Sequence, residues 1–319
     1  MRELLSVLVT VFIFPGFGFL VVCAFLFEWI DRRTIARLQA RVGPPWFQPL
    51  ADLLKLLSKE SVLPEQADRP ICTALPIVSL AAVLTAALYI PVGGRVVYAF
   101  EGDLIVVLFL LSLPALFYFL AGWVSGGIYS ILGGSRSMLQ YFSYEVPFLM
   151  ALSAPAILTG SWSISDIITQ QAEAGWILLV QPLGFLLAVV GLIGKLKRVP
   201  FDIPKAKSEV VGGPLTEFSG RKLALWHLTV DIQTVAGIFL LVNVFLAGGN
   251  LAFMQGSASQ GLVRPVAFAA KAIVMLLTLS VTSALYARLR IDQLASLGWR
   301  VLAPLGLVQL AATMLIGVG

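Results

Sequence analysis

Eight apolar runs, each of about 20 residues, constrain the fold more than any other feature of this sequence. An α-helix needs about that length to cross the hydrocarbon core of a bilayer, because it rises about 1.5 Å per residue. The mean hydropathy is +0.93. Charged residues make up 12%, against about 25% in soluble domains. The sequence therefore predicts an all-α integral membrane protein, with residues 1–319 forming a single polytopic domain. The eight predicted transmembrane helices cover residues 4–27, 70–92, 103–126, 138–160, 175–196, 224–247, 265–287 and 299–318.

The first apolar run, residues 4–27, is expected to be a retained transmembrane helix. It is longer than the apolar core of a signal peptide, and no small-residue cleavage site follows it.

The basic residues predict how the helices are oriented. Of the 22 Lys and Arg residues, 18 lie in or at the edges of the segments that follow the first, third, fifth and seventh predicted helices. Basic residues concentrate in cytoplasmic loops. We therefore expect a multi-pass protein of a prokaryotic cytoplasmic membrane, with both termini on the non-cytoplasmic side.

Two of the predicted cytoplasmic segments have patterns of their own. In residues 45–60, leucines at helical spacing alternate with charged side chains, which predicts an amphipathic helix in the membrane interface. Residues 195–223 form a charged loop in which Pro200, Pro204 and the Gly212–Pro214 stretch predict short turns and helices.

Charged side chains inside the predicted helices are costly, so each is a candidate functional residue. Glu145 lies about two turns into the fourth helix, and we interpret it as a proton-handling carboxylate. The alternative is a structural ion pair with Arg136. His227 and Asp231 share one face of the sixth helix at i and i+4, where they either carry protons or satisfy each other at the interface. Lys271 is expected to extend its ammonium group to the interface.

The charged loop interleaves acids and bases, a pattern that suits both proton entry and partner docking. Burial raises the pKa of a carboxylate while nearby cations lower it, so such groups can exchange protons near neutral pH. A docking surface for a soluble partner is the alternative, and one segment can serve both purposes. The acids are Asp202, Glu209 and Glu217, and the bases are Lys205, Lys207, Arg221 and Lys222.

Several kinds of site are missing from the sequence. Cys23, Cys72 and the single His227 do not form a metal-binding pattern, so we expect no metal and no redox cofactor in this chain. No nucleotide-binding or hydrolase motif is visible. The basic segments lack the interleaved aromatic residues of nucleic-acid binders, which argues against a nucleic-acid partner. Any redox chemistry is therefore expected in partner subunits.

Several ordered motifs resemble the family of complex I subunit 1. The signature loop reads RVPFDIPKAKSE at 198–209 and TEFSGRKLAL at 216–225. Agreement also covers RLQARVGPP at 37–45, QPLAD at 48–52, KE at 59–60, LAGW at 120–123, SILGGSR at 130–136 and SYEVP at 143–147.

This resemblance implies a membrane subunit that connects a peripheral redox arm to ion-pumping neighbours. By motif position, Asp202, Glu209 and Glu217 would line the entrance of a hydrophilic path that Glu145 continues into the membrane. Arg41 and the amphipathic helix would lie near the docked redox subunit. The residues expected to form the docking surface are Arg37, Arg41, Lys205, Lys207, Arg221 and Lys222.

Two departures from the family pattern favour one branch of it. The segment GPPWFQP at 43–49 is shorter than in the quinone-reducing members, and Lys205 and Lys207 replace acids. The shortened segment looks more like its counterparts in the ferredoxin-driven, membrane-bound group 4 nickel–iron hydrogenases. The two lost negative charges put a like-for-like proton path in doubt and suggest a different partner surface. We therefore expect a non-catalytic subunit that couples electron transfer to translocation of H⁺ or Na⁺. Its partners would be ferredoxin, hydrogenase-type large and small subunits with iron–sulfur clusters and a nickel–iron centre, and antiporter-like membrane subunits.

Two other functions remain open from the sequence. One is the quinone-site subunit of an NADH/quinone oxidoreductase, and the other is a passive membrane anchor for the redox arm. Exchange of Glu145 and Glu209 for glutamine would leave ion pumping intact only if the anchor hypothesis is right.

Overall fold

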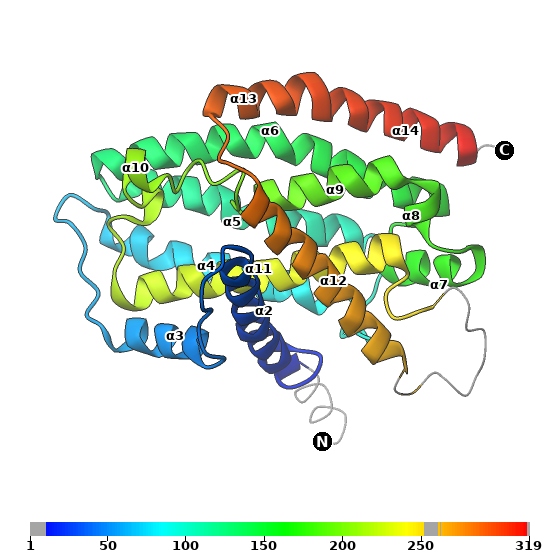
Figure 1. Cartoon of the computed structure of the whole chain (residues 1–319), viewed down its shortest axis with the longest axis horizontal. Coiled ribbons are helices and arrows are strands. Elements are labelled where there is room, and N and C mark those ends of the chain that lie inside the picture. The colour runs from blue at the N-terminus through cyan, green and yellow to red at the C-terminus, as the bar shows by residue number, and fades with distance from the viewer. Residues whose placement is uncertain (1–10, 252–260, 262, 318–319) are drawn as a thin grey trace.

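The computed structural model describes residues 11–251, 261 and 263–317, and within them the chain is helices and connecting loops (Figure 1). The β pairing among these residues is an isolated bridge between Val92 and Arg95. In chain order the elements are α2 (Phe17–Leu38), α3 (Gln48–Ser58), α4 (Arg69–Leu88), α5 (Asp103–Val124), α6 (Ile128–Thr159), α7 (Ile164–Ala174), α8 (Ile177–Val180), α9 (Pro182–Lys195), α10 (Lys207–Val210), the 3₁₀ turn η1 (Gly213–Leu215), α11 (Gly220–Leu246), α12 (Val263–Leu285), α13 (Ile291–Leu297), the π-helical turn η3 (Gly298–Leu302) and α14 (Ala303–Gly317).

The predicted all-α integral membrane fold is confirmed. Six helical segments in the described part of the chain are long and apolar enough to cross a bilayer: α4, α5, α6, α11, α12 and the run Ile291–Leu315. The shorter α9 is also apolar. The remaining long helix, α2, is less apolar because its second half carries five charged residues.

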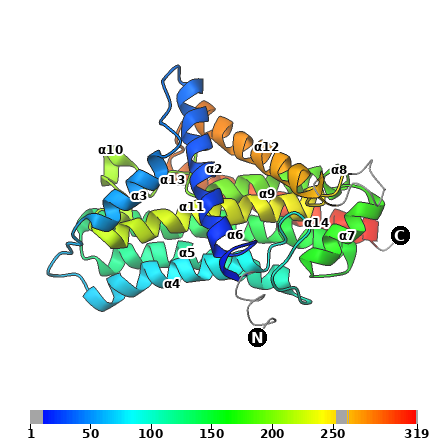
Figure 2. The same ribbon diagram turned by 90° about the horizontal axis from the view of Figure 1, so that it is seen from below.

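Most of the long helices run side by side, while α2 crosses them steeply (Figures 1 and 2). The central helix is α11, which contacts α2, α3, α4 and α12 and has 83% of its apolar stretch buried. Burial of apolar helix faces against one another forms one large core, which includes Leu20, Val83, Leu111, Phe245 and Leu276. Through this core, α2 packs against the other helices.

Three of the predicted helices need corrected boundaries. The first predicted helix, 4–27, lies partly outside the described residues, and α2 begins later and extends to Leu38. The fourth begins at Ile128 and not at 138. The predicted 175–196 helix is divided into α8 and α9, because Pro182 cannot donate a hydrogen bond and starts a new helix. The last includes residue 318, which also lies outside the described part.

The two predicted segments between helices are present. The amphipathic segment 45–60 contains α3, whose exposed leucines (Leu50, Leu54 and Leu57) point away from the bundle. The charged segment 195–223 contains α10 and η1 and packs onto α6. Close packing is possible because Gly133 faces the backbone of Gly213, where a Cβ atom on either residue would collide with its neighbours.

Candidate functional site

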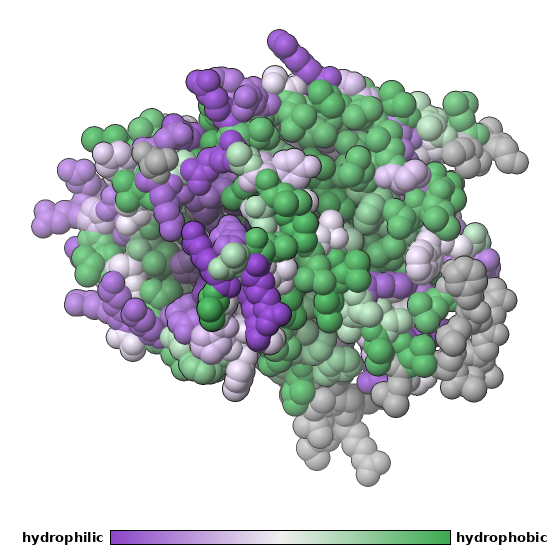
Figure 3. Space-filling view, in the orientation of Figure 1, coloured by the Kyte–Doolittle hydropathy of each residue, from purple (hydrophilic) through white to green (hydrophobic). Residues whose placement is uncertain are grey.

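Hydrophilic side chains gather at one end of the helix bundle, in the left half of Figure 3. We call this the charged end. It comprises the segments 39–68 and 196–219, with α3 and α10. The surface over the opposite half of that view is mainly apolar.

A cavity of about 360 Å³ lies between α2, α3 and α11. His227 and Asp231 reach its wall from α11, as their shared helix face predicts. Glu28 and Arg32 reach it from α2, and Asp52 from α3. The remaining lining residues are Phe25, Pro49, Leu53, Lys55, Leu56 and Lys59. The lining of the cavity therefore combines apolar side chains with seven titratable or charged ones.

Ion pairs brace one wall of this cavity. The Arg32 guanidinium donates hydrogen bonds to Glu28 at 2.5 Å and to Asp52 at 2.8 Å, which joins α2 to α3. Partial burial would raise the pKa of Asp52, but the hydrogen bonds from Arg32 and Gln48 outweigh it and hold the pKa below its ordinary value. Asp52, Lys55, Leu53 and Leu56 of α3 line the cavity, whereas Leu50, Leu54 and Leu57 are exposed on its other side. The exposed leucines form an apolar face that suits lipid.

Glu145 on α6 forms a buried ion pair with Lys195 at the end of α9. The Lys195 Nζ atom donates to Glu145 Oε1 at 2.9 Å, and the side chains are 1% and 6% exposed respectively. The second carboxylate oxygen has no hydrogen-bond partner among the described residues. Removing a pair of opposite charges from water is costly, so burial of this ion pair opposes the stability gained from the apolar contact around it.

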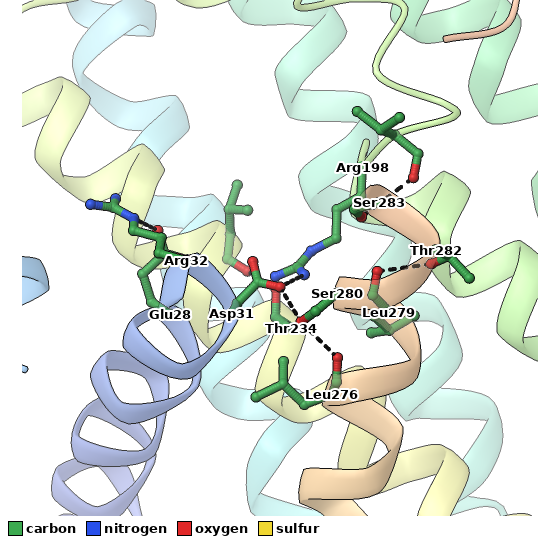
Figure 4. A network of polar contacts seen from close by, with 12 residues as sticks. Glu28, Asp31, Arg32, Arg198, Thr234, Leu276, Leu279, Ser280, Thr282 and Ser283 are labelled. Atoms are coloured by element: carbon green, nitrogen blue, oxygen red, sulfur yellow. Dashed lines mark hydrogen bonds and ion pairs between the residues drawn. The ribbon is translucent and has the colours of Figure 1, made fainter. Parts of the chain in front are cut away.

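A second buried network joins three elements far apart in the chain. Figure 4 shows Asp31 on α2 between Arg198, from the charged loop, and Ser280 on α12. Arg198 donates to Asp31 Oδ1 at 2.8 Å, and the Ser280 hydroxyl donates to the same oxygen at 2.5 Å. Asp31 thereby joins α2 to the charged loop and to α12.

Two further ion pairs fasten the charged loop on its outer side. Arg288 donates to Asp202 at 2.9 Å, and Arg136 pairs with Glu209. Burial raises the pKa of Asp202, although the neighbouring Lys205 and Arg288 oppose this effect. Glu209 is exposed, and the hydrogen bond and charge of Arg136 hold its pKa below the ordinary value. Arg136 therefore binds Glu209 and not Glu145, so the alternative interpretation of Glu145 as the partner of Arg136 is wrong.

Two lysines of the loop share one aromatic ring. The Nζ atom of Lys197 lies 4.4 Å from the ring centroid of Tyr118, and that of Lys205 lies 6.0 Å from it. Burial, followed by repulsion from Lys205 and Lys195, lowers the pKa of Lys197 to about 7. Burial also lowers the pKa of Lys205.

The predicted coupling residues thus fall into three places. His227 and Asp231 line the cavity. Asp202 and Glu209 hold the outer side of the charged loop, and Glu145 lies inside the bundle. Glu217 lies beside Gly127, where α6 begins. The structure does not bring these residues into one cluster, and their roles stay predictions.

The predicted docking residues are also spread over the charged end. Arg37 and Arg41 are exposed at and beyond the end of α2, and Lys207 and Arg221 are exposed as well. Lys222 and Lys205 are half-buried. The position of Lys205 over Tyr118 is better suited to an internal electrostatic role than to direct contact with a partner.

Five charged residues of this network were missed by sequence reasoning. The search for charges inside predicted helices did not reach Asp31, because it lies past the predicted end of the first helix. The four others lie in segments rich in basic residues, where a single cation does not stand out: Lys195, Lys197, Arg198 and Arg288. A useful signal would have been Lys195 at the very end of an apolar run, where a lone cation needs a partner.

Lys271, whose ammonium group is expected to extend to the interface, directs that group to the end of α11. Its Nζ atom donates to the backbone oxygens of Leu246, Gly248 and Asn250 at 2.6–2.9 Å. These carbonyls lie at and beyond the end of α11, where no further helical turn can satisfy them. The side chain therefore caps α11, stacked 4.8 Å from the ring of Trp176.

Comparison with known sequences gives consistent matches over nearly the whole chain. A family model described as NADH dehydrogenase matches residues 9–314. An NADH-quinone oxidoreductase subunit of Dehalococcoides mccartyi strain CBDB1 is 35% identical over 305 residues, which cover 93% of this chain and 83% of that relative. The NADH-quinone oxidoreductase subunit matched in Thermomicrobium roseum is 34% identical over 313 residues, which cover 90% of this chain and 89% of the relative.

A chain of one solved complex shares this fold over the entire length of that chain. It is a chain of the membrane-bound sulfane sulfur reductase, described as an archaeal respiratory membrane complex. The TM-score is 0.84 at 28% sequence identity, and the match covers 98% of this chain and 100% of the other.

Proposed function

The chain belongs to the NADH dehydrogenase family and is a membrane subunit of a complex I-type respiratory oxidoreductase, and we propose that it couples electron transfer in a peripheral arm to translocation of H⁺ or Na⁺. The observation that carries this proposal is the buried Glu145–Lys195 pair. The pair lies where the charged loop joins the bundle, so a change of charge in the loop alters the electrostatic potential at Glu145 and Lys195. The carboxylate would respond by changing its protonation or hydration.

Three ion pairs support a mechanical connection along this route. Asp31–Arg198, Asp202–Arg288 and Arg136–Glu209 join the charged loop to α2, to the segment after α12 and to α6. A displacement of the loop by a docked partner must therefore break or shift contacts on several helices. Coupling of this kind is a linkage between two sites through elements that have two arrangements.

We further propose that the complex is quinone-free, ferredoxin-oxidising and of the hydrogenase type. The short segment 43–49 and the lysines at positions 205 and 207 support this branch. The chain lengths support the quinone-free part of this proposal, because the match covers the sulfane sulfur reductase chain completely but leaves part of each quinone oxidoreductase subunit unmatched. The iron–sulfur clusters and a nickel–iron centre would belong to the large and small partner subunits.

In this proposal the charged end faces the cytoplasm of a prokaryote and receives the peripheral arm. The excess of basic residues at this end supports that orientation. Antiporter-like subunits would pack against other faces of the bundle and move the ion.

A quinone-site subunit is the second candidate, because both apolar and charged side chains line the cavity between α2, α3 and α11. The names of the curated relatives also favour it. A lipid quinone in this cavity predicts that added quinone is reduced by the complex and that quinone-site inhibitors stop turnover.

The coupling proposal is tested with the double variant Glu145→Gln/Lys195→Met in the intact complex. This variant removes both charges together, so the bundle is not left with an unpaired buried charge. In proteoliposomes we expect assembly and electron transfer to persist and ion translocation to be lost. The exposed Arg69, replaced by glutamine, is the matched control for loss of a cation at the same end. Normal translocation by the double variant would instead support the passive-anchor hypothesis.

The hydrogenase-type branch is tested by the nickel content of the complex purified through this subunit. About one nickel per complex is expected, together with abundant iron. Iron without nickel would reject this branch and favour a sulfur compound or quinone as the electron acceptor.

A further inference from the structure

Three lysines and two carboxylates neighbour one another pairwise between the interior of the bundle and the charged loop. Glu145 and Lys195 are paired at the inner end. Lys197 and Lys205 follow, both over the ring of Tyr118. Asp202, which attracts the Lys205 ammonium group, stands at the outer end.

We propose that Lys197 is a proton-exchanging residue that links the buried Glu145–Lys195 pair to Asp202 on the charged loop. This inference rests on the proposed coupling function and names a carrier within it. The carrier is a lysine, which alternates between an ammonium cation and a neutral amine.

The surroundings of Lys197 distinguish it from the two other lysines. Lys195 has a carboxylate at 2.9 Å, and Lys205 is attracted by Asp202. Lys197 forms no ion pair with any described residue, although the residue is only 9% exposed. The aromatic face of Tyr118 stabilises its charged form, since a ring attracts a cation that lies above it.

The charged groups that face Lys197 come from every element packed around it. Lys195 on α9 and Lys205 in the loop repel the ammonium group, Glu145 on α6 attracts it, and Tyr118 on α5 contributes its ring. With a pKa of about 7, Lys197 exists in both protonation states near neutral pH. A small change in these charges is then enough to add or remove its proton.

The proton step needs no other reactant than water. The Lys197 ammonium gives one proton to a water molecule at the loop, where the Asp202 carboxylate is a suitable acceptor. One N–H bond breaks, one O–H bond forms, and no electrons are transferred. The neutral amine later takes a proton back by the same route.

The geometry also sets the direction of the coupling. When Glu145 is ionised, its charge compensates Lys195 and favours the proton on Lys197. When Glu145 is protonated, the Lys195 cation is uncompensated and repels the Lys197 ammonium more strongly, so Lys197 releases its proton. Protonation inside the bundle is thereby linked to proton release at the loop.

The first test measures the titration of Lys197 in the intact complex. Reductive methylation with formaldehyde is carried out between about pH 5 and 10, and the labelling of each lysine is read by mass spectrometry, with the other lysines as internal rate references. We expect a midpoint near 7 for Lys197. Glu145→Gln should lower the midpoint and Lys195→Met should raise it. A midpoint near the ordinary value for lysine, or one that neither variant moves, would overturn the proposal.

The second test follows ion translocation per electron pair as a function of pH. Lys197→Arg keeps the charge at every pH, while Lys197→Gln removes it. Lys197 has a left-handed backbone conformation (φ 51°), so both substitutions are made at the same backbone geometry. We expect both to lose the pH-dependent step near neutrality, and Arg69→Gln to retain it.

The two tests separate this inference from the function on which it rests. If the wild-type complex translocates no ion, the coupling function fails, whatever the labelling shows. If the wild-type complex translocates ions and both Lys197 variants keep its pH profile, the carrier role of Lys197 fails alone.

Discussion

Replacement of Lys195 by methionine is expected to destabilise the protein strongly, because it leaves the Glu145 carboxylate unpaired inside the bundle. The two side chains are 1% and 6% exposed, and Lys195 Nζ also lies 4.8 Å from the ring of Phe148. Water therefore has little access to either charge. The second oxygen of Glu145 has no hydrogen-bond partner among the described residues, so little else compensates the carboxylate.

The magnitude follows from this burial. Removal of one partner from a buried ion pair costs about 3–5 kcal/mol, much of which is the desolvation of the remaining charge. That corresponds to a change of roughly a hundredfold to several thousandfold in the unfolding equilibrium. The addition of Glu145→Gln removes the remaining charge, so the double variant should return to within about 1–2 kcal/mol of the wild type.

The assay is a double-mutant cycle on the free energy of unfolding of the purified chain in mixed micelles. The wild type, both single variants and the double variant are unfolded under identical conditions, and the four free energies give the coupling between positions 145 and 195. Single-variant losses below about 1 kcal/mol, or losses that simply add in the double variant, would refute the reasoning. Either result would mean that water screens the pair.

Three further outcomes follow from the structure. Gly213→Ala should lower the free energy of unfolding by at least about 2 kcal/mol more than Gly160→Ala does. Both residues have a left-handed φ (+67° and +66°), but only at Gly213 would the new Cβ meet the carbonyl oxygen of Pro204. Equal losses would contradict the packing argument. Because the pKa of Lys197 is about 7 in the folded chain and about 10.4 when unfolded, the unfolded chain binds more protons between these values; stability should therefore rise with pH across that window, and Lys197→Gln should flatten the rise. Lys271→Met should cost about 2–4 kcal/mol, because three carbonyls at the end of α11 lose a charged donor; a loss below about 0.5 kcal/mol would show that water replaces the ammonium group.

The family and the class of fold could be predicted from local sequence alone. Apolar runs of membrane-spanning length, the loop motif at 198–209 and the uneven distribution of basic residues each depend on a few neighbouring positions. The amphipathic helix was predicted for the same reason, since leucines at helical spacing define its apolar face whatever lies beyond it. The division at Pro182 could also have been anticipated, because the ring of proline prevents a continuous helix.

The tilt of a helix and the residues at which it begins and ends are harder to predict from the sequence. The predicted first helix stopped where charges begin, but α2 continues through Asp31 and Arg32 because those charges find partners on other elements. A hydropathy average over neighbouring residues counts each charge as unfavourable. It contains no information on a partner 167 residues away, such as Arg198 for Asp31. The crossing of α2 over α11 likewise depends on the packing of both helices.

The sequence by itself determined that this chain spans a membrane, belongs to a complex I-type family and carries acids where the bilayer makes them costly. Only the tertiary structure decided which cation faces which acid. The sequence offered Arg136, on the same helix, as a partner for Glu145, whereas the actual partner is Lys195 from another helix. The physical reason is that the cost of a buried charge is a local property, visible in the sequence, whereas its compensation depends on distances that folding alone sets.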